Sequence, residues 1–326
     1  MKEEYYQTLK SVETEDWLDF HVIRPLCYYC AKGFDAFDIH PNTVTILSMI
    51  IGAASCVLFV HGCLYYEGIT GLICNLGAIA MLMIADILDC TDGQLARMTG
   101  KKSRLGRILD GLAGFVWFIP IYHAIMYRFY LHHEIEFSWL GIEDTPTNAI
   151  IATVVVYCFT LYSGFIGMGG QQRLADYYIQ VHLFFLKGEK GSELDNSVRQ
   201  QEAYDNLPKD APAYERIFQK SYVDYTRKQE KATPQFQRLM AKLREKYGSA
   251  DQMPEEVRNE FHRHSLALMK WNGLLTFNFR SGWLFLFCLL DIPVMHSFFE
   301  GIAMALLAWY INHRHETFSK KIADKL

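Results

Sequence analysis

The chain has 326 residues, of which 51% are hydrophobic and 21% are charged, and its net charge is −4 at pH 7. Such averages fit an ordinary soluble protein of one or two domains. The distribution of charge excludes that interpretation, because the segment 187–270 holds half of the Lys and Arg residues and the rest contains long runs almost without charge. No nucleic-acid partner is expected.

Near the N-terminus, residues 17–37 mix aromatic and aliphatic side chains at helical spacing with a few charged ones. This pattern predicts an amphipathic helix that lies at a bilayer surface. Pro41 follows and is a start signal for the helix of the first apolar run.

Six apolar runs follow in chain order. A helical run of about 18 or more residues is long enough to cross ~30 Å of hydrocarbon. Six such runs argue against buried helices of a large soluble core. The runs cover residues 43–60, 69–88, 111–127, 148–170, 272–290 and 294–311. The polar segment 187–270 lies between the fourth and fifth runs and is helical by composition, which predicts a solvated insert.

Positive charge is distributed unevenly over the loops. The N-terminal segment, the loop between runs two and three, the insert and the tail are basic, whereas the alternate loops lack Lys and Arg, apart from Arg128 at the edge of one. Because basic loops remain cytoplasmic, both termini and the insert are predicted in the cytoplasm.

The sequence therefore predicts an all-α, polytopic integral membrane protein with six transmembrane helices, in a bacterial inner membrane or an equivalent one. Its predicted segments are a cytoplasmic N-terminal segment with the surface helix (1–42), transmembrane helices one to four (43–186), the cytoplasmic insert (187–270), and helices five and six with a cytoplasmic tail (271–326).

The end of the second run carries acidic residues, which are costly to bury in a membrane without a partner. Asp89 and Asp92 are three positions apart and are neighbours on one helical face. Gly93, Ala96 and Arg97 fall on the same face. That face offers two carboxylates, room for a ligand and one guanidinium.

Asp110 brings a third carboxylate back to the same membrane depth after a short basic loop. Mg²⁺ takes oxygen ligands and commonly bridges carboxylates to a substrate phosphate. Arg97 would add bidentate contacts to phosphate. The competing interpretation is a structural acid cluster that pairs with Arg97 and Arg107 and holds the helices together.

This motif resembles the signature of the CDP-alcohol phosphotransferase family at every fixed position but the last. The matching residues are Asp89, Asp92, Gly93, Ala96, Arg97, Gly106 and Asp110. The resemblance implies a pair of Mg²⁺ or Mn²⁺ ions held by Asp89, Asp92 and Asp110, and a homodimer. It also implies donor-binding roles for Gly93, Arg97 and Ser103 at the diphosphate, for Ala96 and Gly106 beside the cytidine, and for Asn42 and Thr45.

Gly114 stands where the family has its last aspartate, four residues after Asp110. In the family that carboxylate is the proposed general base for the attacking hydroxyl, and it helps to hold the metals. Asp86 or a histidine could replace the base, but His123 is nine positions away and lies on the opposite helical face. Gly114 also fits a protein that binds nucleotide without turnover, or an engineered, inactivating substitution.

The resemblance implies transfer of a substituted phosphate from a CDP-linked donor to an alcohol, with release of CMP, in phospholipid biosynthesis. Six spans resemble the phosphatidyl-transferring branch of the family, which implies CDP-diacylglycerol as the donor and membrane lipids as partners. Inositol or inositol phosphate is favoured as the acceptor, because Arg173, Arg280 and the basic second loop suit an anionic polyol. Pairing of Arg280 with an acid such as Asp86 is equally consistent with the sequence.

Three further functions are consistent with parts of the sequence. They are a phosphotransferase that uses CDP-ethanolamine or CDP-choline or acts on ceramide, a non-catalytic protein that binds CDP-lipid, and a transporter. A transporter is disfavoured because the acids lie at a helix end rather than at the bilayer midplane.

Overall fold

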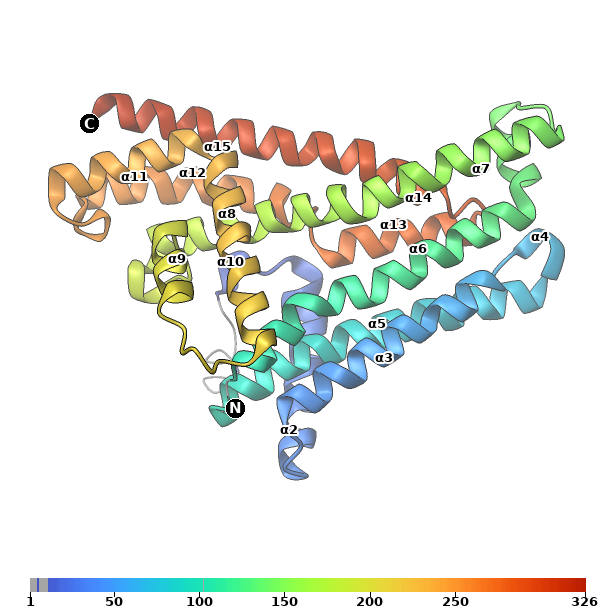
Figure 1. Cartoon of the computed structure of the whole chain (residues 1–326), viewed down its shortest axis with the longest axis horizontal. Helices are drawn as coiled ribbons and strands as arrows, with labels where there is room; N and C mark the ends of the chain where they lie inside the picture. Colours follow the sequence, from blue (N-terminus) through green and yellow to red (C-terminus); the bar gives the residue numbers. More distant parts are fainter. Residues whose placement is uncertain (1–4, 6–10, 102) are drawn as a thin grey trace. The chain divides into compact units, whose positions relative to one another are not determined.

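The computed structural model describes residue 5 and residues 11–326 except residue 102 (Figure 1). Within this part of the chain every regular element is a helix and there is no β-strand. The predicted all-α class is therefore confirmed. The chain divides into two compact units, Met1–Met168 with Phe277–Ala303 and Gly169–Thr276 with Met304–Leu326.

The first unit contains the N-terminal helices and the helices of the predicted motif. They are η1 (Val12–Thr14), η2 (Asp19–Ile23), α2 (Arg24–Ala36), α3 (Pro41–Val60), α4 (Leu64–Glu67), α5 (Ile69–Thr99), α6 (Arg104–Leu140), α7 (Pro146–Leu161), η3 (Tyr162–Met168), α13 (Phe277–Leu289), α14 (Met295–Phe298) and most of η6 (Phe299–Met304).

Four helices in the described chain are long and apolar enough to cross a membrane. They are Pro41–Val60, Ile69–Thr99, Ile108–Leu140 and Pro146–Lys187. Each contains one of the first four predicted apolar runs. The fifth run is shorter than predicted, because a turn at residues 274–276 separates α13 from the helix before it. Its 13 residues span about 20 Å at ~1.5 Å per residue, less than the ~30 Å of hydrocarbon. Six spans therefore stay a prediction.

The N-terminal segment is helical in η2 and α2, and it has an exposed apolar side. Trp17 is 72% exposed and Tyr29 is 65% exposed, while Cys27 and Ala31 are fully buried. The predicted amphipathic character of this helix is not decided by these exposures. The location of the helix at a bilayer surface stays a prediction.

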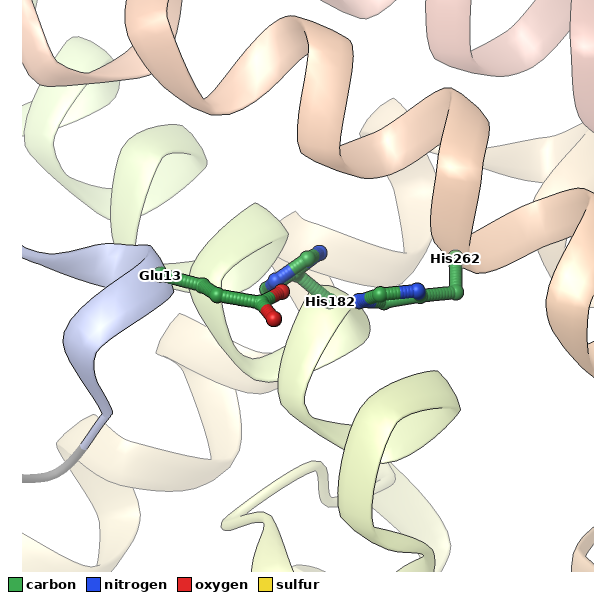
Figure 2. A group of neighbouring side chains, drawn as sticks. All are labelled: Glu13, His182 and His262. Carbon is green, nitrogen blue, oxygen red and sulfur yellow. The ribbon is translucent and has the colours of Figure 1, made fainter.

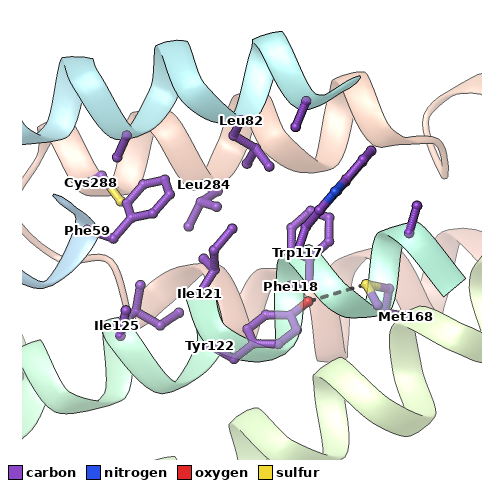
Figure 3. Close-up of a cluster of buried hydrophobic side chains, with 14 of the residues drawn as sticks. Phe59, Leu82, Trp117, Phe118, Ile121, Tyr122, Ile125, Met168, Leu284 and Cys288 are labelled. Atoms are coloured by element: carbon purple, nitrogen blue, oxygen red, sulfur yellow. Dashed lines mark hydrogen bonds between the residues drawn. The ribbon is translucent and has the colours of Figure 1, made fainter. Parts of the chain in front are cut away.

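Helices α3, α5 and α6 pack side by side around an apolar core (Figures 1 and 3). Phe59, Leu82 and Ile121 are fully buried in it. Trp117 of α6 donates its indole N–H to the Ser48 carbonyl of α3 over 3.1 Å. A Cβ at Gly52 would lie 2.2 Å from the Trp117 ring, so glycine is what permits this close helix packing.

The second unit contains the predicted insert and the helices on either side of it. They are α8 (Gly169–Lys187), η4 (Glu189–Gly191), α9 (Ser197–Asp205), α10 (Ala213–Ala232), α11 (Pro234–Tyr247), η5 (Ala250–Gln252), α12 (Glu255–Gly273) and α15 (Ala305–Lys325).

Aromatic and histidine side chains hold the second unit together. Phe185 of α8 stacks on Phe261 of α12 with ring centroids 3.9 Å apart. His182 of α8 stacks on His262 of α12 at 5.0 Å (Figure 2). The predicted insert is helical, and its helices pack with α8 and α15 in one compact unit.

Candidate functional site

The predicted motif lies where α5 ends and α6 begins. α5 ends at Gly100, which adopts a left-handed conformation with φ +70°, as is common after a helix C-terminus. Ser103 then begins α6 as its N-cap, and its hydroxyl accepts a 2.9 Å hydrogen bond from the Gly106 N–H. The left-handed Gly100 and the Ser103 cap end one helix and begin the next within a few residues, so the start of α6 lies beside the end of α5.

The environment of the Asp89 carboxylate is the strongest indication of a metal site. The Asp89 side chain is half-buried, and its Oδ1 atom is buried and has no hydrogen-bond partner among the described residues. It interacts electrostatically with Asp110 and Asp92, which are also acids. A buried carboxylate oxygen without a donor, beside two further carboxylates, fits a divalent cation.

The three carboxylates form a loose group. Their oxygen atoms do not all lie within 4.8 Å of one another in the described chain. Asp92 is 5% exposed, whereas Asp110 is exposed at the beginning of α6. The set therefore runs from the buried Asp92, through the half-buried Asp89, to the exposed Asp110.

Helix α3 supplies polar partners to both sides of this site. The Thr45 hydroxyl donates a hydrogen bond to Asp92 Oδ2. Asn42 Oδ1 accepts a 3.2 Å hydrogen bond from the Ser103 hydroxyl. A Cβ at Gly106 would lie 2.7 Å from Asn42 Oδ1 and 3.0 Å from Ser103 Oγ. Gly106 thus leaves room for the Asn42–Ser103 contact, which is a role distinct from its predicted place beside the cytidine.

Two cationic groups border the carboxylates. A Cβ at Gly93 would lie 3.4 Å from Arg97 Nη1, so the Arg97 side chain lies over Gly93. Arg24 of α2 interacts electrostatically with Asp89 and with Arg97. The sequence interpretation missed Arg24. Its signal was a basic residue at the start of a helix that is mostly aromatic and aliphatic.

Arg24 is held in place from two directions. Its Nε donates to Glu15 Oε2 over 3.0 Å, and its backbone carbonyl accepts from the Gln94 amide of α5 over 3.2 Å. Helix α2 is therefore fixed against α5 next to the motif.

A further ion pair joins the loops beside the site. Lys101 Nζ donates to Asp38 Oδ1 over 2.5 Å, and this hydrogen bond lowers the pKa of the exposed Asp38 carboxyl. The pair joins the turn before α3 to the turn before α6.

The segment that contains the motif was compared with known protein families. Residues 38–162 match the model of the CDP-alcohol phosphatidyltransferase family. The resemblance predicted from the motif is thereby confirmed, and the match contains α3, α5, α6, α7 and every motif residue. No curated protein and no solved structure matches the chain.

The match to the CDP-alcohol phosphatidyltransferase family indicates a broad class of chemistry. Its members are membrane transferases that move phosphate groups from CDP-alcohol donors to alcohol acceptors in lipid synthesis, and they generally depend on Mg²⁺ or Mn²⁺. With four helices of spanning length, the chain is an integral membrane protein.

Gly114 lies in α6, one turn beyond Asp110, within the family segment. A Cβ built on it meets no atom within 4 Å, so the structure has room for a carboxylate there. The strongest electrostatic partners of Asp86 are Asp19, Arg24 and Asp16 of the N-terminal segment, which indicates that Asp86 faces α2. His123 is exposed, with Nδ1 2.7 Å from the Ile119 carbonyl.

The remaining predicted residues lie apart from the motif. Arg280 is fully buried in α13 and pairs with the fully buried Glu300. Pairing with an acid is therefore observed, although the partner is Glu300 rather than Asp86. Arg173 belongs to the second unit, where its carbonyl accepts from the Gln229 amide over 3.2 Å. Contact of either residue with substrate stays a prediction. The proposed pairing with Arg107 lies outside the described side chains.

Proposed function

We propose that this protein transfers a phosphatidyl group from CDP-diacylglycerol to an alcohol, releases CMP, and does so with divalent metal at Asp89, Asp92 and Asp110. The family match over residues 38–162 supports the reaction class. The main support for a metal at this site is the buried Asp89 Oδ1 atom, which has no hydrogen-bond donor among the described residues. The proposal includes six spans, cytoplasmic termini, a homodimer, and inositol or inositol phosphate as the acceptor.

The residues of the chain have distinct tasks in this reaction. Thr45 orients Asp92 through its hydroxyl, as a supporting hydrogen bond typically does for a ligating carboxylate. Arg97 lies over Gly93, where it would bind diphosphate oxygens that come close to the helix backbone. Asp89, Asp92 and Asp110 would hold a divalent ion, which would supply positive charge to the phosphates and to the leaving CMP.

The attacking hydroxyl must lose its proton, and Gly114 provides no group to accept it. General-base catalysis typically contributes about 10²–10⁴-fold. We therefore propose slow turnover for this chain. Gly114→Asp is expected to raise the rate of CMP release by a factor within that range, because the space at Gly114 accommodates a side chain.

The test is CMP release from CDP-diacylglycerol with inositol, inositol phosphate, ethanolamine, choline and ceramide as acceptors, and from CDP-ethanolamine. Wild type, Gly114→Asp and Asp89→Asn are compared, with the exposed Asp210→Asn as the matched control. Loss in Asp89→Asn but not in Asp210→Asn supports the proposal. No release with any acceptor, Gly114→Asp included, contradicts it.

The second candidate is a non-catalytic protein that binds CDP-lipid, and Gly114 is the observation that favours it. It predicts Mg²⁺-dependent CDP binding by calorimetry, without turnover in Gly114→Asp. The same set of variants therefore separates the two functions.

A further inference from the structure

The first unit contains an apolar pocket far from the motif. Its volume is about 350 Å³, and it is formed by the end of α6, the beginning of α7 and the segment around α14. This volume is at the lower end of the ~300–1,000 Å³ typical of ligand pockets. The apolar lining includes Phe137, Ala152, Met295 and Phe298.

The pocket lies at the other end of the spanning helices from the motif. Its Glu136 is 26 positions after Asp110 on α6, which corresponds to about 39 Å along a helix at ~1.5 Å per residue. A non-helical residue, His132, bends α6 and shortens the straight-line separation. The distance is still comparable with the ~30 Å of hydrocarbon. In a bilayer that these helices span, the pocket would therefore lie in the leaflet opposite to the motif.

Glu136 is the unusual feature of this pocket. It is 3% exposed, and the pocket lining contains no Lys, Arg or His. Arg128 lies outside the lining, is 2% exposed and forms its ion pair with Asp291. Arg128 also interacts electrostatically with Glu136, but these two described side chains form no ion pair with each other. A carboxyl group at membrane depth is costly unless it meets a cation or hydrogen-bond donors.

We propose that the pocket binds a phospholipid of that leaflet whose headgroup carries a primary ammonium, with Glu136 as the partner of the ammonium. The pocket belongs to candidate spans Ile108–Leu140 and Pro146–Lys187, so its apolar walls are filled by an acyl chain. An ammonium with three N–H donors supplies both charge and hydrogen bonds to the carboxylate. A quaternary headgroup has no N–H donor, and an anionic headgroup repels the carboxylate.

This inference does not depend on phosphotransfer, and lipid retention tests it directly. The full chain, purified in detergent, is incubated with phosphatidylethanolamine, phosphatidylcholine or phosphatidylglycerol that carry the same acyl chains. Native mass spectrometry then measures the lipid retained on the protein. We expect about tenfold stronger retention of phosphatidylethanolamine than of either other lipid.

Two variants assign that retention to the pocket. Glu136→Gln keeps the shape of the side chain and is expected to remove the preference for phosphatidylethanolamine. Ala152→Phe fills the pocket and is expected to reduce retention of all three lipids at this site, with circular dichroism to verify that the variant is folded. Glu143→Gln, at an exposed carboxylate in the loop that follows α6, is the matched control and should behave as wild type.

Equal retention of the three lipids by wild type would overturn the proposal. So would an unchanged preference in Glu136→Gln. If Ala152→Phe is folded and retains phosphatidylethanolamine as wild type does, the lipid binds elsewhere and the pocket assignment is wrong.

Discussion

The hydroxyl of Thr45 in α3 donates a hydrogen bond to the carboxylate of Asp92 in α5. Both groups are buried, at 2% and 5% exposure. The contact joins the first two spanning helices at the depth of the motif and fixes the direction of one carboxylate. Because the unfolded chain has no such partner in place, the orientation of Asp92 depends on the packing of α3 on α5.

Thr45→Val should weaken metal-dependent nucleotide binding. The substitution keeps the side-chain shape but removes a hydroxyl that supports a ligand carboxylate, which typically costs about 10–100-fold in metal affinity. Calorimetry of CDP binding at several Mg²⁺ concentrations measures the effect. Thr45→Ser keeps the donor and should retain most of the affinity.

The exposed Thr43→Val is the matched control for this change in the same helix. Wild-type affinity in Thr45→Val would show that the Asp92 carboxylate needs no support from α3.

Arg24→Gln should raise the dissociation constant for CDP about tenfold. Arg24 interacts electrostatically with Asp89 and Arg97, so it adds positive charge where the diphosphate is predicted to bind. A hydrogen bond to a charged group contributes about 1.5–3 kcal/mol, and tenfold in affinity corresponds to about 1.4 kcal/mol.

Lys32→Gln removes a charge from the same helix and should leave CDP affinity unchanged. If both variants weaken CDP binding equally, the loss results from the lower net charge of the protein. Arg24 would then make no specific contact with the diphosphate.

Sequence patterns predicted those features that depend on local chemistry. Apolar length predicted the first four spanning helices, and helical spacing placed Asp89 beside Asp92. Arg24 was missed because its position next to Asp89 results from the packing of α2 on α5, which no spacing rule encodes. The contact between Asn42 and Ser103 likewise joins residues 61 positions apart. For Arg280 the sequence suggested an acid such as Asp86, and the acid observed is Glu300, because both are acids within apolar runs and only packing decides between them.

Arg280→Met should destabilise the fold strongly. It leaves Glu300, which also accepts from the Tyr122 hydroxyl over 2.6 Å, as a buried carboxylate without its cation. Removing one partner of a buried pair typically costs about 3–5 kcal/mol, whereas replacing both by apolar residues is often neutral. Thermal unfolding of Arg280→Met and of Arg280→Met with Glu300→Met measures the difference.

The double variant also tests the predicted contact of Arg280 with substrate. A purely structural role predicts that the double variant recovers both stability and donor affinity. Recovered stability with weakened donor binding would favour the substrate role, and the exposed Arg314→Met is the control for loss of a single charge.

The second unit should lose stability as pH falls from about 6.5 towards 4. Burial lowers the pKa of His264 to about 4, and it lowers the pKa of His315 further. An unfolded histidine has a pKa of about 6.5. Between these values the unfolded chain binds protons that the folded chain does not, so the free energy of unfolding rises with pH. The contribution of His264 is complete above about 6.5 and is lost as pH falls through about 4.

Asp19 of the first unit acts in the opposite direction, because burial raises its pKa to about 6 and folding then favours its protonated form. The stability that this proton supplies is present at acid pH and is lost as pH rises through about 6. Variants must therefore be compared at each pH.

His264→Phe retains an aromatic ring against Phe318, whose ring stacks on His264 at 3.8 Å. It should flatten the acid side of the melting-temperature profile. His313→Phe, at an exposed histidine that stacks on Trp309, should leave the profile unchanged. An unaltered acid slope in His264→Phe would mean that its burial does not govern the acid sensitivity of this unit.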